Sequence, residues 1–133
     1  MCVATNTCLH LVGKLGFLLN SSRLKRAGLD YWEHLHPQIF PDLSLYLEQL
    51  PPSSFSIYST KGKKSYLEKK YLPDEILIFG SEDRGFPASF LSKHPEKIYC
   101  IPMQNQLVRS LNLSSSVAVV LFEALRQSQK PEI

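Results

Sequence analysis

Apolar residues along this chain follow two spacings. Short apolar runs predict buried strands over residues 9–12, 75–79 and 97–101, and Phe55 and Ile57, which face one way, predict another over residues 54–59. Recurrence of apolar residues at every third or fourth position predicts helices over residues 41–50, 87–92 and 114–127. Because the strands alternate with helices and the run over residues 75–79 is continuous, we expect an α/β fold with a mostly parallel sheet. Ligands of such sheets bind beyond the carboxyl ends of the strands.

The predicted helices have recognisable ends. Pro41 is expected at the first position of the helix over residues 41–50, because its ring fits the first helical turn. A further short basic helix is expected over residues 23–27, capped by Ser21 or Ser22 and ended by Gly28.

Length and composition indicate one ordinary globular domain over residues 1–133. The chain has 44% hydrophobic and 20% charged residues, with a net charge of +3 that is compatible with a nucleic-acid partner but does not establish one. Three cysteines without a Cys-x-x-Cys pair, and histidines without metal spacing, predict neither a disulfide framework nor a metal site. We therefore expect a cytoplasmic protein that needs no metal.

The apolar run at residues 8–19 could be mistaken for the core of a signal peptide. His10 and Lys14 interrupt it, and no basic region precedes it. No other stretch reaches the length of a transmembrane helix, so we expect no membrane partner.

Unusual loops follow three of the predicted strands, at residues 59–62, 80–85 and 102–112. In the second loop, Gly80 and Gly85 would let the backbone approach a ligand closely, but the pattern is neither that of a dinucleotide site nor that of a P-loop. The alternative is a tight left-handed turn with an exposed Glu82/Arg84 pair.

The third loop places polar residues directly before a predicted helix. Arg109, Ser110 and Asn112 at a helix N-terminus would form a corner suited to an anion or a hydroxyl group. The alternative is an ordinary helix cap, which accounts for one of Asn112 and Ser114.

Lysines cluster around the first loop. Such a run is usually a solvated face, but together with the basic helix of residues 23–27 it could form a track for phosphates. Tyr66 and Tyr71, interleaved with the lysines, would then be available to stack on unpaired bases. The residues proposed for RNA contact are Arg23, Arg26, Lys61, Lys63, Lys64 and Arg84.

Two segments resemble motifs of a known family. Residues 79–87, Phe-Gly-Ser-Glu-Asp-Arg-Gly-Phe-Pro, resemble the second motif of the SPOUT RNA methyltransferases, and residues 101–103 with residues 109–114 resemble the third. Residues 23–31 and 60–62 are similar to the subfamily that methylates the ribose 2′-oxygen of the tRNA wobble nucleotide. The resemblance covers roughly residues 3–127.

The resemblance implies a deep trefoil knot in the C-terminal half, S-adenosylmethionine as cofactor, a homodimer, and a tRNA anticodon loop as the partner. It implies that the cofactor is lined by Tyr58, Gly80, Ile101, Ser110 and Leu111. Glu82 and Arg84 would brace the pocket or contact RNA. The catalytic set carried over is Arg109, Ser110 and Asn112, which would hold the target ribose.

The chain also departs from this family. Its relatives open with a strand and an Asn-Thr-Gly-Asn-Ile-x-x-Arg type motif, and nothing here matches either, so the first strand is expected to be missing. Phe122 stands where wobble-methylating relatives often have tyrosine.

The expected function is tRNA 2′-O-methylation at the wobble nucleotide, either cytidine or a modified uridine. The alternatives are a noncatalytic RNA-binding or dimerisation module derived from the same fold, and a domain that binds S-adenosylmethionine without an RNA substrate.

Overall fold

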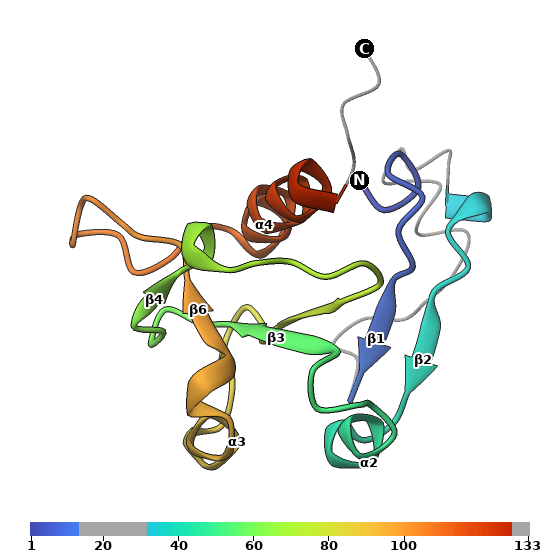
Figure 1. Cartoon of the computed structure of the whole chain (residues 1–133), viewed down its shortest axis with the longest axis horizontal. Helices are drawn as coiled ribbons and strands as arrows, with labels where there is room; N and C mark the ends of the chain where they lie inside the picture. Colours follow the sequence, from blue (N-terminus) through green and yellow to red (C-terminus); the bar gives the residue numbers. More distant parts are fainter. Residues whose placement is uncertain (14–31, 129–133) are drawn as a thin grey trace. The chain divides into compact units, whose positions relative to one another are not determined.

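The computed structural model describes residues 1–13 and 32–128 (Figure 1). These residues form two compact units, residues 1–50 and 51–133, which are described separately. The predicted helix over residues 23–27, with Arg23 and Arg26, lies outside the described residues. Within the described parts of the chain, no helix is long and apolar enough to cross a membrane.

The first unit contains a short parallel strand pair. Strand β1 (His10–Val12) pairs with β2 (Gln38–Phe40), and the 3-10 helix η1 (Trp32–His34) precedes β2. The prediction of a strand ending near residue 12 is confirmed, and the following Gly13 adopts a φ of +90°. Strand β2 was not predicted, because three residues are too few to show an alternation.

Helix α2 (Leu43–Glu48) begins later than expected. Asp42 is its N-cap, since its side chain accepts a hydrogen bond from the backbone N–H of Leu45 at 2.9 Å. The prediction that Pro41 occupies the first helical position is therefore wrong, because the carboxylate of Asp42 satisfies the free N–H group there. Tyr46 is the buried residue of α2, and its hydroxyl lies 2.7 Å from Nδ1 of His10.

The second unit is built on a four-stranded sheet. Its strands run in the order β4 (Lys64–Ser65), β6 (Ile98–Cys100), β3 (Phe55–Tyr58) and β5 (Ile76–Phe79), and every pairing is parallel. The other elements are η2 (Tyr66–Glu68), α3 (Ala88–Lys93), η3 (Pro95–Lys97) and α4 (Leu113–Ser128). This confirms the expected α/β fold with a mostly parallel sheet.

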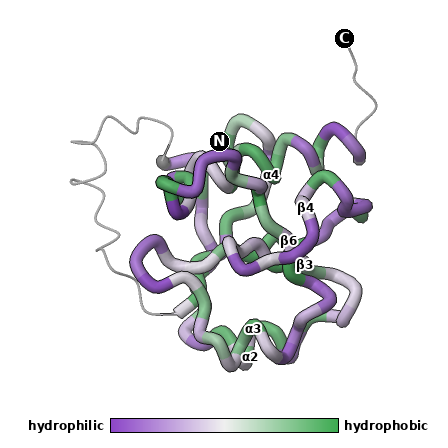
Figure 2. Tube along the Cα trace, turned by 90° about the vertical axis from the view of Figure 1, so that its left-hand side faces the viewer, coloured by the Kyte–Doolittle hydropathy of each residue, from purple (hydrophilic) through white to green (hydrophobic). Residues whose placement is uncertain are grey.

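Helices cover both faces of the central strand. Figures 1 and 2 both show α4 on one side of β3 and α3 on the other. All four residues of β3 are buried, with Ile57 completely inaccessible, so the strand has no solvent-facing side. Val120 of α4 is equally inaccessible and packs with Tyr58 and Tyr71 in one cluster. This cluster forms the core beneath the carboxyl ends of the strands.

Candidate active site

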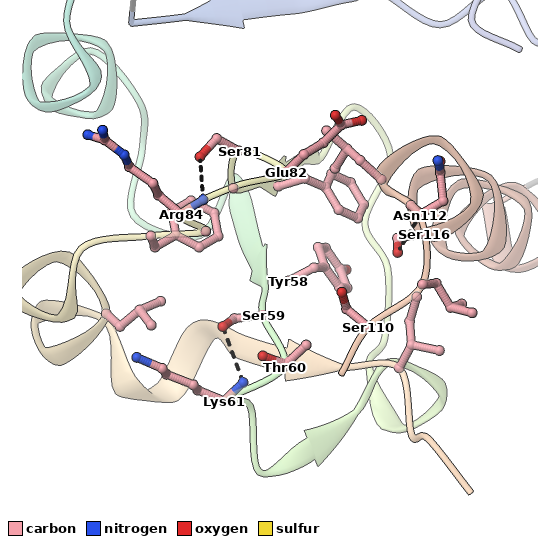
Figure 3. Close-up of a pocket in the computed structure, with 18 of the residues that line it drawn as sticks. Tyr58, Ser59, Thr60, Lys61, Ser81, Glu82, Arg84, Ser110, Asn112 and Ser116 are labelled. Atoms are coloured by element: carbon pink, nitrogen blue, oxygen red, sulfur yellow. Dashed lines mark hydrogen bonds between the residues drawn. The ribbon is translucent and has the colours of Figure 1, made fainter. Parts of the chain in front are cut away.

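A hollow of about 540 Å³ opens at the carboxyl ends of β3, β5 and β6, within the second unit (Figure 3). Residues of all three loops singled out in the sequence line it. The loops converge because parallel strands present their carboxyl ends at one edge of the sheet.

The first wall is the turn that follows β3. Ser59 anchors it: its N–H donates to the carbonyl of Tyr99 at 2.9 Å, and its hydroxyl accepts from the N–H of Lys61 at 3.2 Å. Gly62 packs so closely on β6 that a Cβ atom there would lie 2.5 Å from the carbonyl carbon of Tyr99. The turn therefore requires glycine, and it presents Thr60 and Lys61 to the hollow.

The second wall is the loop after β5. The N–H of Gly85 donates to the carbonyl of Ser81 at 2.9 Å, and Gly85 has a φ of +60°. The tight left-handed turn considered as an alternative is thus confirmed. Glu82 and Arg84 both line the hollow, but Figure 3 shows Arg84 directed away from its centre.

The structure shows a reason for glycine at position 80 that the sequence analysis did not include. A Cβ atom at Gly80 would lie 2.6 Å from the carbonyl carbon of Gly85, within the same loop. The close approach that requires glycine is therefore between two segments of the loop, although Gly80 also lines the hollow.

The third wall is the start of α4. The side-chain oxygen of Asn112 accepts from the N–H of Ser114 at 2.9 Å and from its hydroxyl at 2.7 Å. Asn112 is therefore the residue that caps the helix. Ser110, Leu111 and Asn112 line the hollow together with Ser116, one helical turn further along.

The base of the hollow is aromatic. Tyr58 stacks on Phe79 with ring centroids 5.0 Å apart, and its hydroxyl pairs with that of Ser56 at 2.9 Å. Burial raises the pKa of the Tyr58 phenol far above its usual value, with the neighbouring Tyr71 adding to the shift. Tyr58 is therefore a neutral wall of the site and does not act as a base.

Most of the predicted site residues meet in this hollow. The described residues that line it as expected are Tyr58, Lys61, Gly80, Arg84, Ile101, Ser110, Leu111 and Asn112. Arg109 is exposed on the loop before α4 and is not among the lining residues. Lys63 and Lys64 are exposed but lie outside the hollow, and Lys64 belongs to the edge strand β4.

The sequence analysis did not name some residues that line the hollow, and it predicted exposure for one tyrosine that is buried. Ser59, Met103 and Ser116 line the hollow but were not named as site residues, although Ser59 and Met103 lie within the singled-out segments 59–62 and 101–103 and Ser116 lies just after the third motif. The interpretation of Tyr71 as available for base stacking is wrong, because only 7% of the residue is exposed. Its hydroxyl donates to the carbonyl of Tyr66 at 3.1 Å, inside the protein.

The chemistry of the hollow suits an organic ligand. Apolar side chains such as Phe79, Ile101 and Leu111 stand beside hydroxyl, amide and charged groups, a mixture typical of sites for ligands with flat rings and polar edges. Within residues 1–13 and 32–128, no three His, Cys, Asp or Glu side chains are grouped so as to hold a metal ion.

Comparison with known proteins connects this geometry to RNA methyltransferases. A tRNA (cytidine(34)-2′-O)-methyltransferase of Burkholderia cenocepacia is 39% identical over 96% of this chain and 83% of its own length. The solved structure of a putative RNA methyltransferase from Bacillus anthracis superposes with a TM-score of 0.87, at 36% identity, over 99% of this chain and 84% of that one.

Two further structures extend the comparison. One, described as "Structural insights into the 2-OH methylation of C/U34 on tRNA", is 40% identical with a TM-score of 0.83, covering 96% of this chain and 82% of that one. An AdoMet-bound rRNA methyltransferase from Sinorhizobium meliloti has a TM-score of 0.75 over 97% of this chain and 49% of its own, but at 19% identity it shows only the shared fold.

The family resemblance found in the two motifs is confirmed by these relatives. A single family model, that of the SpoU rRNA Methylase family, matches residues 1–122, a span that includes the first unit and all three walls of the hollow. The chain belongs to the SpoU rRNA methylase family.

Proposed function

We propose that this chain is an S-adenosylmethionine-dependent tRNA methyltransferase that modifies the ribose 2′-oxygen of the wobble nucleotide, cytidine or a modified uridine, in the anticodon loop. The observation that carries the proposal is the identity of 39% over 96% of the chain with an enzyme named for cytidine 34. The convergence of the three motif loops on one hollow supports it.

In this proposal the hollow binds S-adenosylmethionine, which supplies an electrophilic methyl group. The residues assigned to the cofactor all line the hollow: Tyr58, Gly80, Ile101, Ser110 and Leu111. Because Tyr58 is buried and neutral, its part is to shape the pocket. The Sinorhizobium protein, which has the same fold, is described as AdoMet-bound, which supports the choice of cofactor.

Transfer joins the 2′-oxygen to the methyl carbon, breaks the carbon–sulfur bond and releases the hydroxyl proton. The protein must hold the oxygen in line behind the methyl carbon, and such positioning supplies several kcal/mol of catalysis. We assign this positioning to Arg109, Ser110 and Asn112. Asn112 uses its side-chain oxygen to cap α4, so its amide nitrogen is the group directed to substrate.

The phosphates of the anticodon loop are assigned to the exposed basic side chains beside the hollow. These are Lys61, Lys63, Lys64 and Arg84, with Arg23 and Arg26 as further candidates. Lys61 on the first wall and Arg84 on the second are both exposed, and Arg84 points away from the centre of the hollow, which supports contact with RNA at the rim.

The proposal extends to the assembly. Residues 1–133 would act as one cytoplasmic domain with a trefoil knot, as the SPOUT resemblance implies, and would function as a homodimer. Leu107, 91% exposed on the loop before α4, and Phe122, 57% exposed on α4, support a partner surface because both are large and apolar.

Three measurements on the whole chain test the function: calorimetric binding of S-adenosylmethionine, binding of tRNA, and transfer of labelled methyl to tRNA. We expect all three to be positive. RNA binding alone would instead favour the noncatalytic module, and cofactor binding alone would favour a domain without an RNA substrate.

The RNA surface has its own test. In a Lys63→Ala/Lys64→Ala protein, tRNA affinity should fall, and the slope of log affinity against log salt should decrease by somewhat under one unit for each lysine–phosphate interaction removed. Cofactor affinity should not change. Lys93→Ala, which removes a lysine at the end of α3, is the matched control. If the double variant binds tRNA with the affinity and salt slope of the parent, Lys63 and Lys64 do not contact tRNA.

A further inference from the structure

The segment between η2 and β5, residues 69–75, lies close to the core without regular secondary structure of its own. Its backbone N–H and C=O groups therefore need partners from elsewhere. Gln127, in the last turn of α4, provides two: its side-chain oxygen accepts from the N–H of Tyr71 at 3.0 Å, and its side-chain nitrogen donates to the carbonyl of Lys69 at 3.0 Å. One amide side chain thus pairs with the segment as a neighbouring strand would.

The orientation of this amide is itself fixed. The nitrogen of Gln127 also donates to Oε1 of Glu123 at 2.8 Å, one helical turn earlier. Arg126 holds the same carboxylate through two bonds of 2.8 Å. The hydrogen bonds from Arg126 and Gln127 lower the pKa of Glu123 to about 2, so Glu123 stays an acceptor at every working pH.

The segment is anchored at further points. Lys69 forms an ion pair of 2.8 Å with Glu75, whose side chain is only 2% exposed, and Glu75 accepts a hydrogen bond from the N–H of Leu72 at 3.0 Å. Hydrogen bonds and an ion pair therefore hold segment 69–75 in place, and Gln127 supplies the hydrogen bonds that join it to α4.

This contact connects two walls of the hollow. Tyr71, whose N–H is held by Gln127, packs against Tyr58 in the core cluster, and Tyr58 lines the hollow. At its other end α4 begins at the third wall, where Leu113 and Ser116 line the hollow. Because a helix is stiff over this length, the contact at its C-terminal end acts together with the packing of Val120 on Tyr58 and Tyr71 to fix the aromatic wall relative to the third wall.

We infer that Gln127 is a positioning residue for the cofactor hollow: by clamping segment 69–75 to α4, it contributes a polar contact that helps to set the distance between the aromatic wall at Tyr58 and the wall at the start of α4. The inference rests on the proposed function, since it treats the hollow as the S-adenosylmethionine site. Gln127 does not itself line the hollow, so it acts through Tyr71 and α4.

The first test compares Gln127→Met with Ser128→Ala. Methionine keeps the length of the side chain but removes the hydrogen bonds to the segment, whereas Ser128→Ala removes a hydrogen bond to the carbonyl of Ala124 in the same helical turn and leaves Glu123 and the segment untouched. At a temperature where all proteins are folded, Gln127→Met should weaken S-adenosylmethionine binding roughly three- to tenfold and accelerate hydrogen exchange at the Tyr71 amide. Ser128→Ala should change neither.

The second test uses Gln127→Glu at two pH values. As a carboxylate, residue 127 cannot donate to the carbonyl of Lys69 and is repelled by Glu123, whereas the protonated acid restores the donor. The other charged groups nearby are the same in the parent and the variant, so they do not account for a difference between the two proteins. These groups are Arg126, Lys69 and Glu75. Because the carboxyl group of glutamate has a pKa of about 4.3 in model peptides, cofactor affinity should be reduced at pH 7.5 and should recover part of the way toward that of the parent at pH 4, with the parent measured at both pH values.

The outcomes separate the two proposals. If the parent chain binds no S-adenosylmethionine, the proposed function fails, and this inference with it. If the parent binds but the folded Gln127→Met protein binds equally well, this inference alone is overturned. If Gln127→Met does not fold, the Gln127→Glu protein decides, and a deficit that shows no recovery at pH 4 overturns the inference.

Discussion

Replacing Gly80 by alanine should damage the loop after β5 and the hollow together. The added Cβ atom would lie 2.6, 2.8 and 2.9 Å from three backbone atoms of Gly85, where ordinary contact begins at 3.4 Å. Backbone cannot rotate aside as a flexible side chain can, so the turn between Ser81 and Gly85 has to open. Overpacking of this kind costs about 1–3 kcal/mol.

Thermal unfolding and calorimetry measure the two effects. Each kcal/mol lowers the melting temperature by about 3–5 °C in a chain of this size, so a shift of several degrees is expected, together with weaker S-adenosylmethionine binding. Gly85→Asn is the control, because a Cβ atom there meets nothing within 4 Å and asparagine tolerates its φ of +60°. It should melt closer to the parent than Gly80→Ala does.

A Gly80→Ala protein that melts within a degree of the parent and keeps its cofactor affinity would refute this reasoning. Such a result would mean that the close approach of Gly80 and Gly85 is not a constraint in solution.

Three more predictions concern α4. Asn112→Ala should lower stability by about 1 kcal/mol because the helix cap is removed, whereas Asn112→Asp should keep the cap; equal melting temperatures for the two would exclude this role. Val120→Ala should cost about 2–3 kcal/mol in denaturant unfolding, from roughly 0.8 per methylene group plus the cavity left in a fully buried site. The pKa of Glu123 is lowered to about 2 from an ordinary 4.5, so its contribution is present above about pH 4.5 and disappears as pH falls toward 2. Glu123→Gln should flatten the acid side of the stability curve slightly, because Arg126 is largely exposed and solvent screens the pair.

The sequence predicted those elements whose burial leaves a regular pattern. Strands β5 and β6 are continuous apolar runs and β3 is apolar except for Ser56, because helices cover both faces of the sheet, and α4 shows helical spacing along its whole length. Strand β4 has only two residues and includes Lys64, so neither its length nor its polarity distinguishes it from a loop.

Long-range polar contacts leave no comparable pattern. Tyr71 stands among lysines and has the composition of an exposed residue, yet its N–H is bonded to Gln127, 56 positions away in the chain. The site loops were predictable because they follow recognisable strands, whereas the support behind them depends on the folded geometry. The contact of Gly80 with Gly85 could not be predicted on the same ground, because it too depends on the folded geometry of the loop.

The central position of β3 affects how the second unit can fold as it is made. Strand β3 pairs with β5 on one side and with β6 on the other, and β6 begins 40 residues after β3 ends (98 − 58 = 40). At roughly 5–20 residues per second, the ribosome needs about 2–8 s to supply those residues. During that interval, β3 has a free edge in the emerging chain.

Val120, which covers the core beneath the strands, is synthesised later still. The nascent chain therefore exposes a mostly apolar strand until residue 120 has left the ribosome, and an exposed strand edge of this kind favours aggregation.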